Sequence, residues 1–179
     1  MKNLLTALIC LASINSLAQR FTVTPQGLRD SKDTSNTYLM IQSPNAGAKQ
    51  LYDGALKYIN ENIPDPQKAI TEQIDSTSIR FDVYVPELLI YNNSGAKIGI
   101  EAFYTTDLRF FDGRFRYEII NLQMKGQGTK YKLLFQGGFL EAYIVYNRKG
   151  KLFKTQTKWD IEDYFNNQVD KLASYINKN

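Results

Sequence analysis

Three acidic residues have the chemistry of a hydrolytic site: Glu101, Asp107 and Glu118 fall on one face of a predicted β-hairpin. Two carboxyl groups held about 5 to 9.5 Å apart are the groups that hydrolyse a glycosidic bond. Arg109 and Arg116 stand beside two of these acids, and a neighbouring arginine favours the charged carboxylate, which opposes a general-acid role. A carboxylate-based hydrolase is therefore an alternative hypothesis rather than the leading one.

The sequence lacks the other common catalytic and metal-binding groups. It contains no histidine, and Cys10 is its single cysteine. Ser-His-Asp and Cys-His nucleophile systems are therefore excluded, as are zinc sites built from histidine and cysteine. Asp160, Glu162 and Asp163 cluster carboxylate oxygens, but acidic residues also favour the start of a helix. The sequence accordingly predicts no catalytic residue, no metal site and no cofactor.

A basic segment gives the strongest indication of function. Residues 125–158 contain eight lysine and arginine residues and a single acid, Glu141, so their net charge is +7. Basic and aromatic residues interleave there, an arrangement that can bind lipid phosphate, an acidic glycan or a nucleic acid. The alternative explanation is an exposed strand edge that lysines protect from aggregation. The candidate binding residues are Lys130, Tyr131, Lys132, Arg148, Lys149, Lys151 and Lys154.

Residues 1–18 have the layout of a secretory signal peptide. Lys2 precedes a mostly apolar stretch, and Ser16 and Ala18 provide the small side chains of a cleavage site before Gln19. The apolar stretch is shorter than the roughly 20 residues that span a membrane. Ile9 and Leu11 flank Cys10, so lipidation of this cysteine is not expected. We therefore expect a periplasmic or extracellular protein, for which nucleic acid is not the expected partner.

The mature chain is predicted to form one domain behind a leader. Residues 19–36 are polar and include Pro25 and Gly27, which favour a flexible leader with a short edge strand at residues 21–23. Residues 37–179 then form a single α+β domain, in which residues 125–158 are an insertion-like basic segment.

Two amphipathic helices are predicted in this domain. Apolar residues recur at helical spacing over residues 51–63, and Pro64 ends the pattern. A second helix runs from an N-cap at Asp160 to the C-terminus, and Trp159 precedes the cap as in a hydrophobic staple. The apolar stripe of each helix is expected to pack on a sheet.

The clearest strand signal is a hairpin with its turn at Asp112-Gly113, because alternating residues flank this strong turn sequence. The turn fixes the register, with apolar pairs on one face and charged pairs on the other. We expect the charged face to be a solvated ionic patch. A second hairpin is predicted from residues 139–146 and 151–157. The pairs expected in the first hairpin are Phe111 with Arg114, Phe110 with Phe115, Arg109 with Arg116, Leu108 with Tyr117 and Asp107 with Glu118.

The sequence resembles a family of exported Bacteroidetes proteins, a domain of unknown function described as having a fold like the TATA-box-binding protein. The resembling pieces are QLYDGALKYINENIPDPQKAI and IGIEAFYTTDLRFFDGRFRYEIINL, within residues 37–122. The resemblance implies a TBP-like α+β fold, an antiparallel sheet with two packed helices. It carries over no catalytic residue.

The leading hypothesis is a non-catalytic envelope domain that binds an anionic component or a protein partner through its basic segment. A further alternative is a structural subunit that self-associates through an apolar patch at Phe103, Ile120 and Leu122.

Overall fold

The structure is a computed structural model that describes residues 19–138 and 142–178. The predicted signal peptide, residues 1–18, lies outside the described residues, as does its Cys10. Within the described ranges, no helix combines the length and the apolar character needed to cross a membrane.

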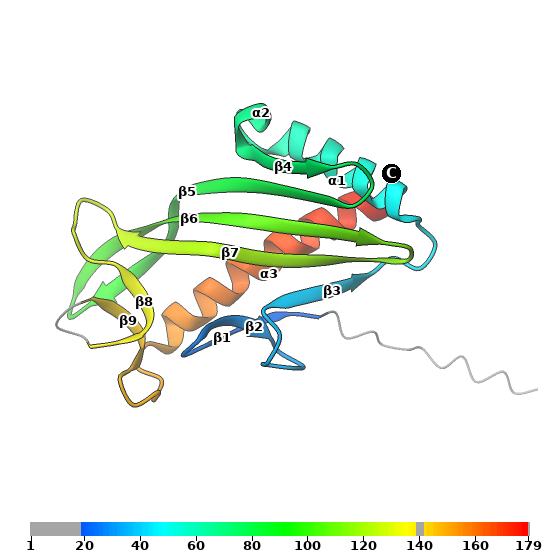
Figure 1. The fold of residues 1–179 in the computed structure, drawn as a ribbon. Coiled ribbons are helices and arrows are strands. Elements are labelled where there is room, and N and C mark those ends of the chain that lie inside the picture. The colour runs from blue at the N-terminus through cyan, green and yellow to red at the C-terminus, as the bar shows by residue number, and fades with distance from the viewer. Residues whose placement is uncertain (1–18, 139–141, 179) are drawn as a thin grey trace, which may run out of the picture.

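A five-stranded antiparallel sheet forms the centre of the fold, and helices α1 and α3 pack on one of its faces (Figure 1). Its strand order is β3-β7-β6-β5-β4, and two small sheets, β1-β2 and β8-β9, lie beside it. This arrangement confirms the predicted α+β class. The elements are β1 Phe21–Thr24, β2 Gly27–Asp30, β3 Tyr38–Gln42, α1 Ala48–Asn62, α2 Pro66–Ala69, β4 Ile70–Ile74, β5 Ser78–Asn93, β6 Ala96–Phe111, β7 Arg114–Gly126, β8 Leu133–Gly137, β9 Tyr143–Asn147 and α3 Thr155–Lys178.

The register predicted for the β6–β7 hairpin is confirmed. Phe110 faces Phe115 and Leu108 faces Tyr117, and all four side chains are buried beneath the helices. Gly113 adopts a positive φ of 76° in the turn, a conformation that glycine tolerates without strain. The turn therefore sets which side chains face the core.

The helices bury the stripes that their spacing predicts. Leu51, Ala55 and Ile59 of α1 are fully buried, as are Ile161 and Phe165 of α3. Burying a large apolar side chain such as Leu51, Ile59 or Phe165 contributes roughly 1.5–3 kcal/mol. The core therefore lies between the two helices and the sheet.

The edge strand predicted at residues 21–23 is present as β1, but residues 19–36 are packed on the domain and do not form a flexible leader. Phe21 and Val23 of β1 are buried, and the β1–β2 hairpin packs against α3. Asn166 of α3 accepts a hydrogen bond from the Phe21 N–H at 2.8 Å and donates one to the Phe21 carbonyl at 3.0 Å. Helix side chains thus satisfy the backbone of β1 in place of a further strand.

The predicted second hairpin is present in shortened form. The chain turns at residues 147–150, and Tyr146 of β9 forms an antiparallel bridge with Leu152. The carbonyl of Val145 accepts hydrogen bonds from the backbone N–H groups of Phe153 and Lys154, which hold these residues beside β9. The second strand ends there, because residues 155–157 belong to α3, which starts before the predicted N-cap at Asp160. Trp159 is exposed, so it forms no hydrophobic staple.

Candidate functional site

Six exposed lysines gather at one end of the molecule, which we name the lysine-rich end. They come from the β5–β6 hairpin, the end of β7, the β7–β8 loop and the β9–α3 loop, which lie together on the left of Figure 1. No salt bridge joins any of them to an acidic residue in the described part of the chain. The six are Lys97, Lys125, Lys130, Lys132, Lys149 and Lys151.

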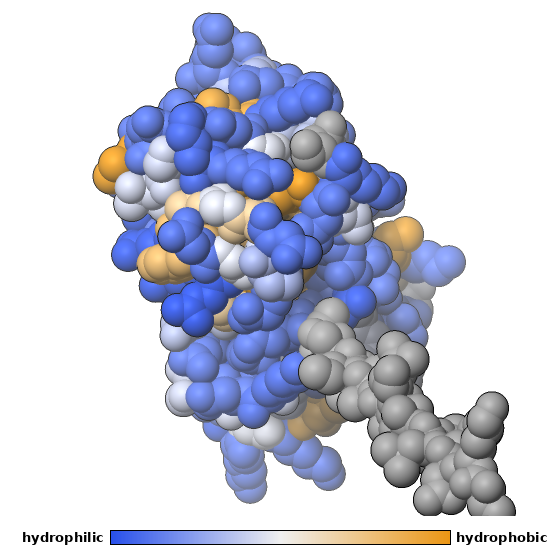
Figure 2. Space-filling view, turned by 90° about the vertical axis from the view of Figure 1, so that its right-hand side faces the viewer, coloured by the Kyte–Doolittle hydropathy of each residue, from blue (hydrophilic) through white to orange (hydrophobic). Residues whose placement is uncertain are grey.

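The opposite end of the molecule has a different surface. Figure 2 views that end, and its hydrophobic residues form only small groups within a mostly hydrophilic surface. Two exposed lysines, Lys171 and Lys178, belong to the second half of α3, and the C-terminal end of α3 lies away from the lysine-rich end in Figure 1. They serve as controls for the lysine-rich end.

Four of the seven predicted binding residues belong to this end as exposed lysines, and the other three have packing contacts. The Lys154 ammonium donates a hydrogen bond to the Asn92 carbonyl at 2.8 Å and lies 5.3 Å from the centre of the Tyr91 ring. Lys154 therefore ties the end of β5 to the start of α3. The Tyr131 ring packs on Tyr143 with 5.8 Å between ring centres. The Arg148 guanidinium lies so close to the Gly138 backbone that a Cβ there would meet it at 2.9 Å.

The β9–α3 loop is held in a defined shape. The Asn147 side-chain oxygen accepts hydrogen bonds from the backbone N–H groups of Lys149 at 2.9 Å and Lys151 at 3.0 Å. Gly150 has a positive φ of 75°, and the Val145 carbonyl accepts the N–H of Phe153 at 2.8 Å. The loop backbone is thus fixed while its lysine side chains extend outward.

The charged face of the β6–β7 hairpin is less solvated than predicted. Asp107 is 4% exposed and Glu118 is 8% exposed. Arg80 of β5 contacts Asp107 at 2.7 Å, Arg109 contacts it at 3.5 Å, and Arg116 pairs with Glu118. The prediction failed because the hairpin pattern alone could not place Arg80 over the acid. Each buried carboxylate therefore faces an arginine.

The other predicted sites on this sheet also differ in detail. Glu101 accepts a hydrogen bond from the Tyr84 hydroxyl at 2.9 Å, well along β6 from the buried acids. A bulge opposite Phe103 includes Asn121 with a positive φ of 55°, and it turns Leu122 toward the core. The predicted apolar patch of Phe103, Ile120 and Leu122 is therefore divided between the two faces.

The acidic cluster at the start of α3 has structural contacts. Glu162 accepts the Val23 N–H at 2.8 Å, Asp163 accepts the Asn167 amide at 3.0 Å, and Asp160 accepts the Gln156 amide at 2.8 Å. Across the described residues, no three acidic side chains come together in an arrangement that could hold a metal ion.

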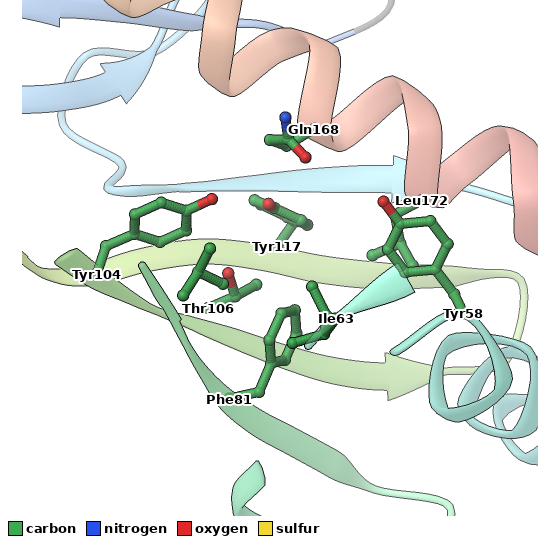
Figure 3. Close-up of a pocket in the computed structure, with 9 residues that line it drawn as sticks. Tyr58, Ile63, Phe81, Tyr104, Thr106, Tyr117, Gln168 and Leu172 are labelled. Atoms are coloured by element: carbon green, nitrogen blue, oxygen red, sulfur yellow. The ribbon is translucent and has the colours of Figure 1, made fainter. Parts of the chain in front are cut away.

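A small cavity between the sheet and the helices brings tyrosine hydroxyls together (Figure 3). Its volume is about 30 Å³, and the hydroxyls of Tyr104 and Tyr117 point toward each other beneath Gln168. The Tyr104 hydroxyl also lies 3.2 Å from that of Tyr164. Thr106 is 1% exposed, and its hydroxyl has no hydrogen-bond partner among the described residues.

Burial determines the electrostatics of this cavity. It raises the pKa of Tyr104 and of Tyr117, because the interior penalises the charged phenolate. None of the lining residues is charged, so the cavity suits a neutral polar molecule and not an ion. The hairpin pattern predicted Tyr117 on the core face. The cavity itself forms only where strands β5, β6 and β7 meet helices α1 and α3, so the sequence pattern could not predict it. The lining residues are Tyr58, Ile63, Phe81, Val83, Tyr104, Thr106, Tyr117, Gln168 and Leu172.

A known crystal structure has a similar fold. It is that of a DUF4468 family protein from Bacteroides ovatus, with a TM-score of 0.52 and 14% sequence identity over 79% of this chain and 85% of that chain. At this identity the similarity shows the fold alone, and it supports the resemblance to an uncharacterised Bacteroidetes family. No protein-family model matches the sequence, and no curated protein matches it.

Proposed function

We propose that the protein is a non-catalytic binding domain that holds an anionic component of the cell envelope through its lysine-rich end. The proposal includes export by the signal peptide and a TBP-like arrangement of the sheet and helices, as the sequence analysis predicts. The observation that carries it is the gathering of six exposed lysines from four segments, without a salt bridge to any described acid.

Charge of one sign at one end creates a field that attracts an anionic partner. Exposed lysines without acidic partners leave their charges uncompensated, and several such charges sum to a potential that concentrates anions near the surface. Salt screens the field, with a Debye length of about 8 Å at physiological ionic strength. Binding through this end should therefore weaken as salt rises.

A pair of charge reversals tests the proposal. Lys149→Glu with Lys151→Glu changes two side chains that make no salt bridge with a described residue, while their backbone N–H groups still hold the loop. Immobilised heparin serves as the anionic probe, and the salt concentration at elution is the measurement. We expect the wild type to be retained and the double variant to elute at much lower salt.

The matched control is Lys171→Glu with Lys178→Glu, which changes the net charge equally at other positions. This control should elute near the wild type. Equal losses in the two double variants would show that only the overall charge matters, and the proposed site would then be wrong.

A further inference from the structure

We infer that the anionic component is the phospholipid surface of a membrane, into which the β9–α3 loop and the start of α3 insert apolar side chains. This inference rests on the proposed function, because the same lysines supply the electrostatic attraction. Binding to a soluble polyanion would require only the lysines. Insertion into a membrane also requires exposed apolar residues among the lysines.

The apolar residues lie next to the lysines in the sequence. Leu152 is 38% exposed, Phe153 is 50% exposed and Trp159 is 57% exposed. Residues 148–159 contain five basic residues and no acidic residue, although Lys158 pairs with Glu162 of α3 and Lys154 bonds to the Asn92 carbonyl. Aromatic side chains prefer the headgroup level of a bilayer, and lysines nearby reach lipid phosphates, each with about 1 kcal/mol of attraction near an anionic surface.

The loop is shaped for insertion. In Figure 1 it projects from the body of the molecule beyond the start of α3. The Val145 carbonyl fixes the backbone of Phe153, and Asn147 fixes the turn before it. Because the backbone of the loop is already ordered, little conformational entropy is lost when the loop enters the membrane–water interface.

A recess beside the loop matches the chemistry of a phospholipid headgroup. It has a volume of about 400 Å³ and lies between the β5–β6 hairpin and the first turn of α3. Ile90 and Phe153 give it apolar walls, and Lys154 gives it a cation. Ile90 is half exposed, so the recess opens to solvent with an apolar rim. An amphiphile with an anionic head meets both requirements.

Trp159 is the single tryptophan of the chain, so its fluorescence reports on insertion directly. The probes are vesicles of phosphatidylcholine alone and vesicles with equal amounts of phosphatidylcholine and phosphatidylglycerol. We expect the purified protein to sediment with the phosphatidylglycerol vesicles only. We also expect its emission to shift to shorter wavelength, because the indole leaves water.

Apolar and basic variants separate insertion from simple charge attraction. Leu152→Ser with Phe153→Ser should lower vesicle affinity about tenfold or more while heparin retention persists, because only the apolar contribution is lost. Tyr84→Ser removes an exposed aromatic residue from the sheet face and should leave vesicle binding unchanged. Lys149→Glu with Lys151→Glu should weaken binding to both probes.

Three outcomes decide between the explanations. Equal binding to both vesicle types, or an unshifted emission, overturns the membrane inference. Heparin binding without vesicle binding overturns it as well, but leaves the proposed function with an acidic glycan as partner. Failure to bind either probe contradicts the proposed function itself.

Discussion

Raising the pH above 10 should destabilise this protein through two buried tyrosines. Tyr104 and Tyr117 lie in the cavity between the sheet and the helices, and burial raises the pKa of each phenol. In the unfolded chain the same phenols ionise near their ordinary pKa of about 10. The folded state therefore retains protons that the unfolded state releases.

The sign and the slope follow from this difference. Below about pH 10 both states hold the two protons, and the contribution of the tyrosines to stability is fully present. Above it the unfolded state binds fewer protons, so the free energy of unfolding falls as pH rises. Each group contributes about 1.4 kcal/mol per pH unit, and the two together about 2.7 kcal/mol. Two pH units would remove roughly 5 kcal/mol, comparable to the whole stability of many domains.

Denaturant unfolding measured at a series of alkaline pH values tests this slope, and tyrosinate absorbance follows ionisation at the same time. Tyr104→Phe and Tyr117→Phe should each reduce the slope by about 1.4 kcal/mol per pH unit, because phenylalanine cannot ionise. The double variant should lose this contribution entirely. The reasoning is refuted if the folded protein ionises all 12 tyrosines before it unfolds, or if the double variant keeps the wild-type slope.

Two further predictions concern buried contacts. Asp107→Ala removes the buried carboxylate that Arg80 contacts at 2.7 Å, leaves Arg80 only its contact with Glu72 at 3.1 Å, and should lower the free energy of unfolding by about 3 kcal/mol in urea titrations. Asp53→Ala, which breaks an exposed pair, should change it by less than about 1 kcal/mol. Similar values for the two variants would contradict the burial argument. Asn166→Ala leaves both backbone groups of Phe21 unpaired and should cost about 2 kcal/mol, with faster amide hydrogen exchange in β1 but not in β6. Unchanged exchange at Phe21 would count against this role.

Local patterns were enough to predict the parts of the fold whose partners are close in sequence. The Asp112-Gly113 turn fixed the five predicted pairs beside it, because strand alternation and turn geometry agree there, but it could not predict the bulge opposite Phe103. A strand at residues 21–23 was also predicted, but its pairing with β2 and its packing on α3 were not. The backbone N–H and carbonyl of Phe21 in β1 form hydrogen bonds with Asn166, which lies 145 residues away in the sequence. No local sequence pattern predicts this contact.

The candidate site was predicted only in part for a similar reason. Composition identified the basic segment, and Lys149 and Lys151 are exposed within it as expected. Lys97 was missed because it joins the others only through the β5–β6 hairpin, outside that segment. Lys154 was predicted as a binding residue, but its hydrogen bond to the Asn92 carbonyl depends on tertiary packing. The tyrosine cavity likewise depends on how distant elements meet.

The contact between Phe21 and Asn166 has a consequence for the order of folding. During synthesis from the N-terminus, β1 is made long before α3. β1 therefore cannot pack on its partner until α3, the last described element, has been made. Closing a loop of this length carries a large entropic penalty and slows the contacts that require it. The sheet made by β5, β6 and β7 has near-neighbour pairings and can assemble earlier. The two ends of the chain then close the structure together, in a late step that no partly synthesised molecule can complete.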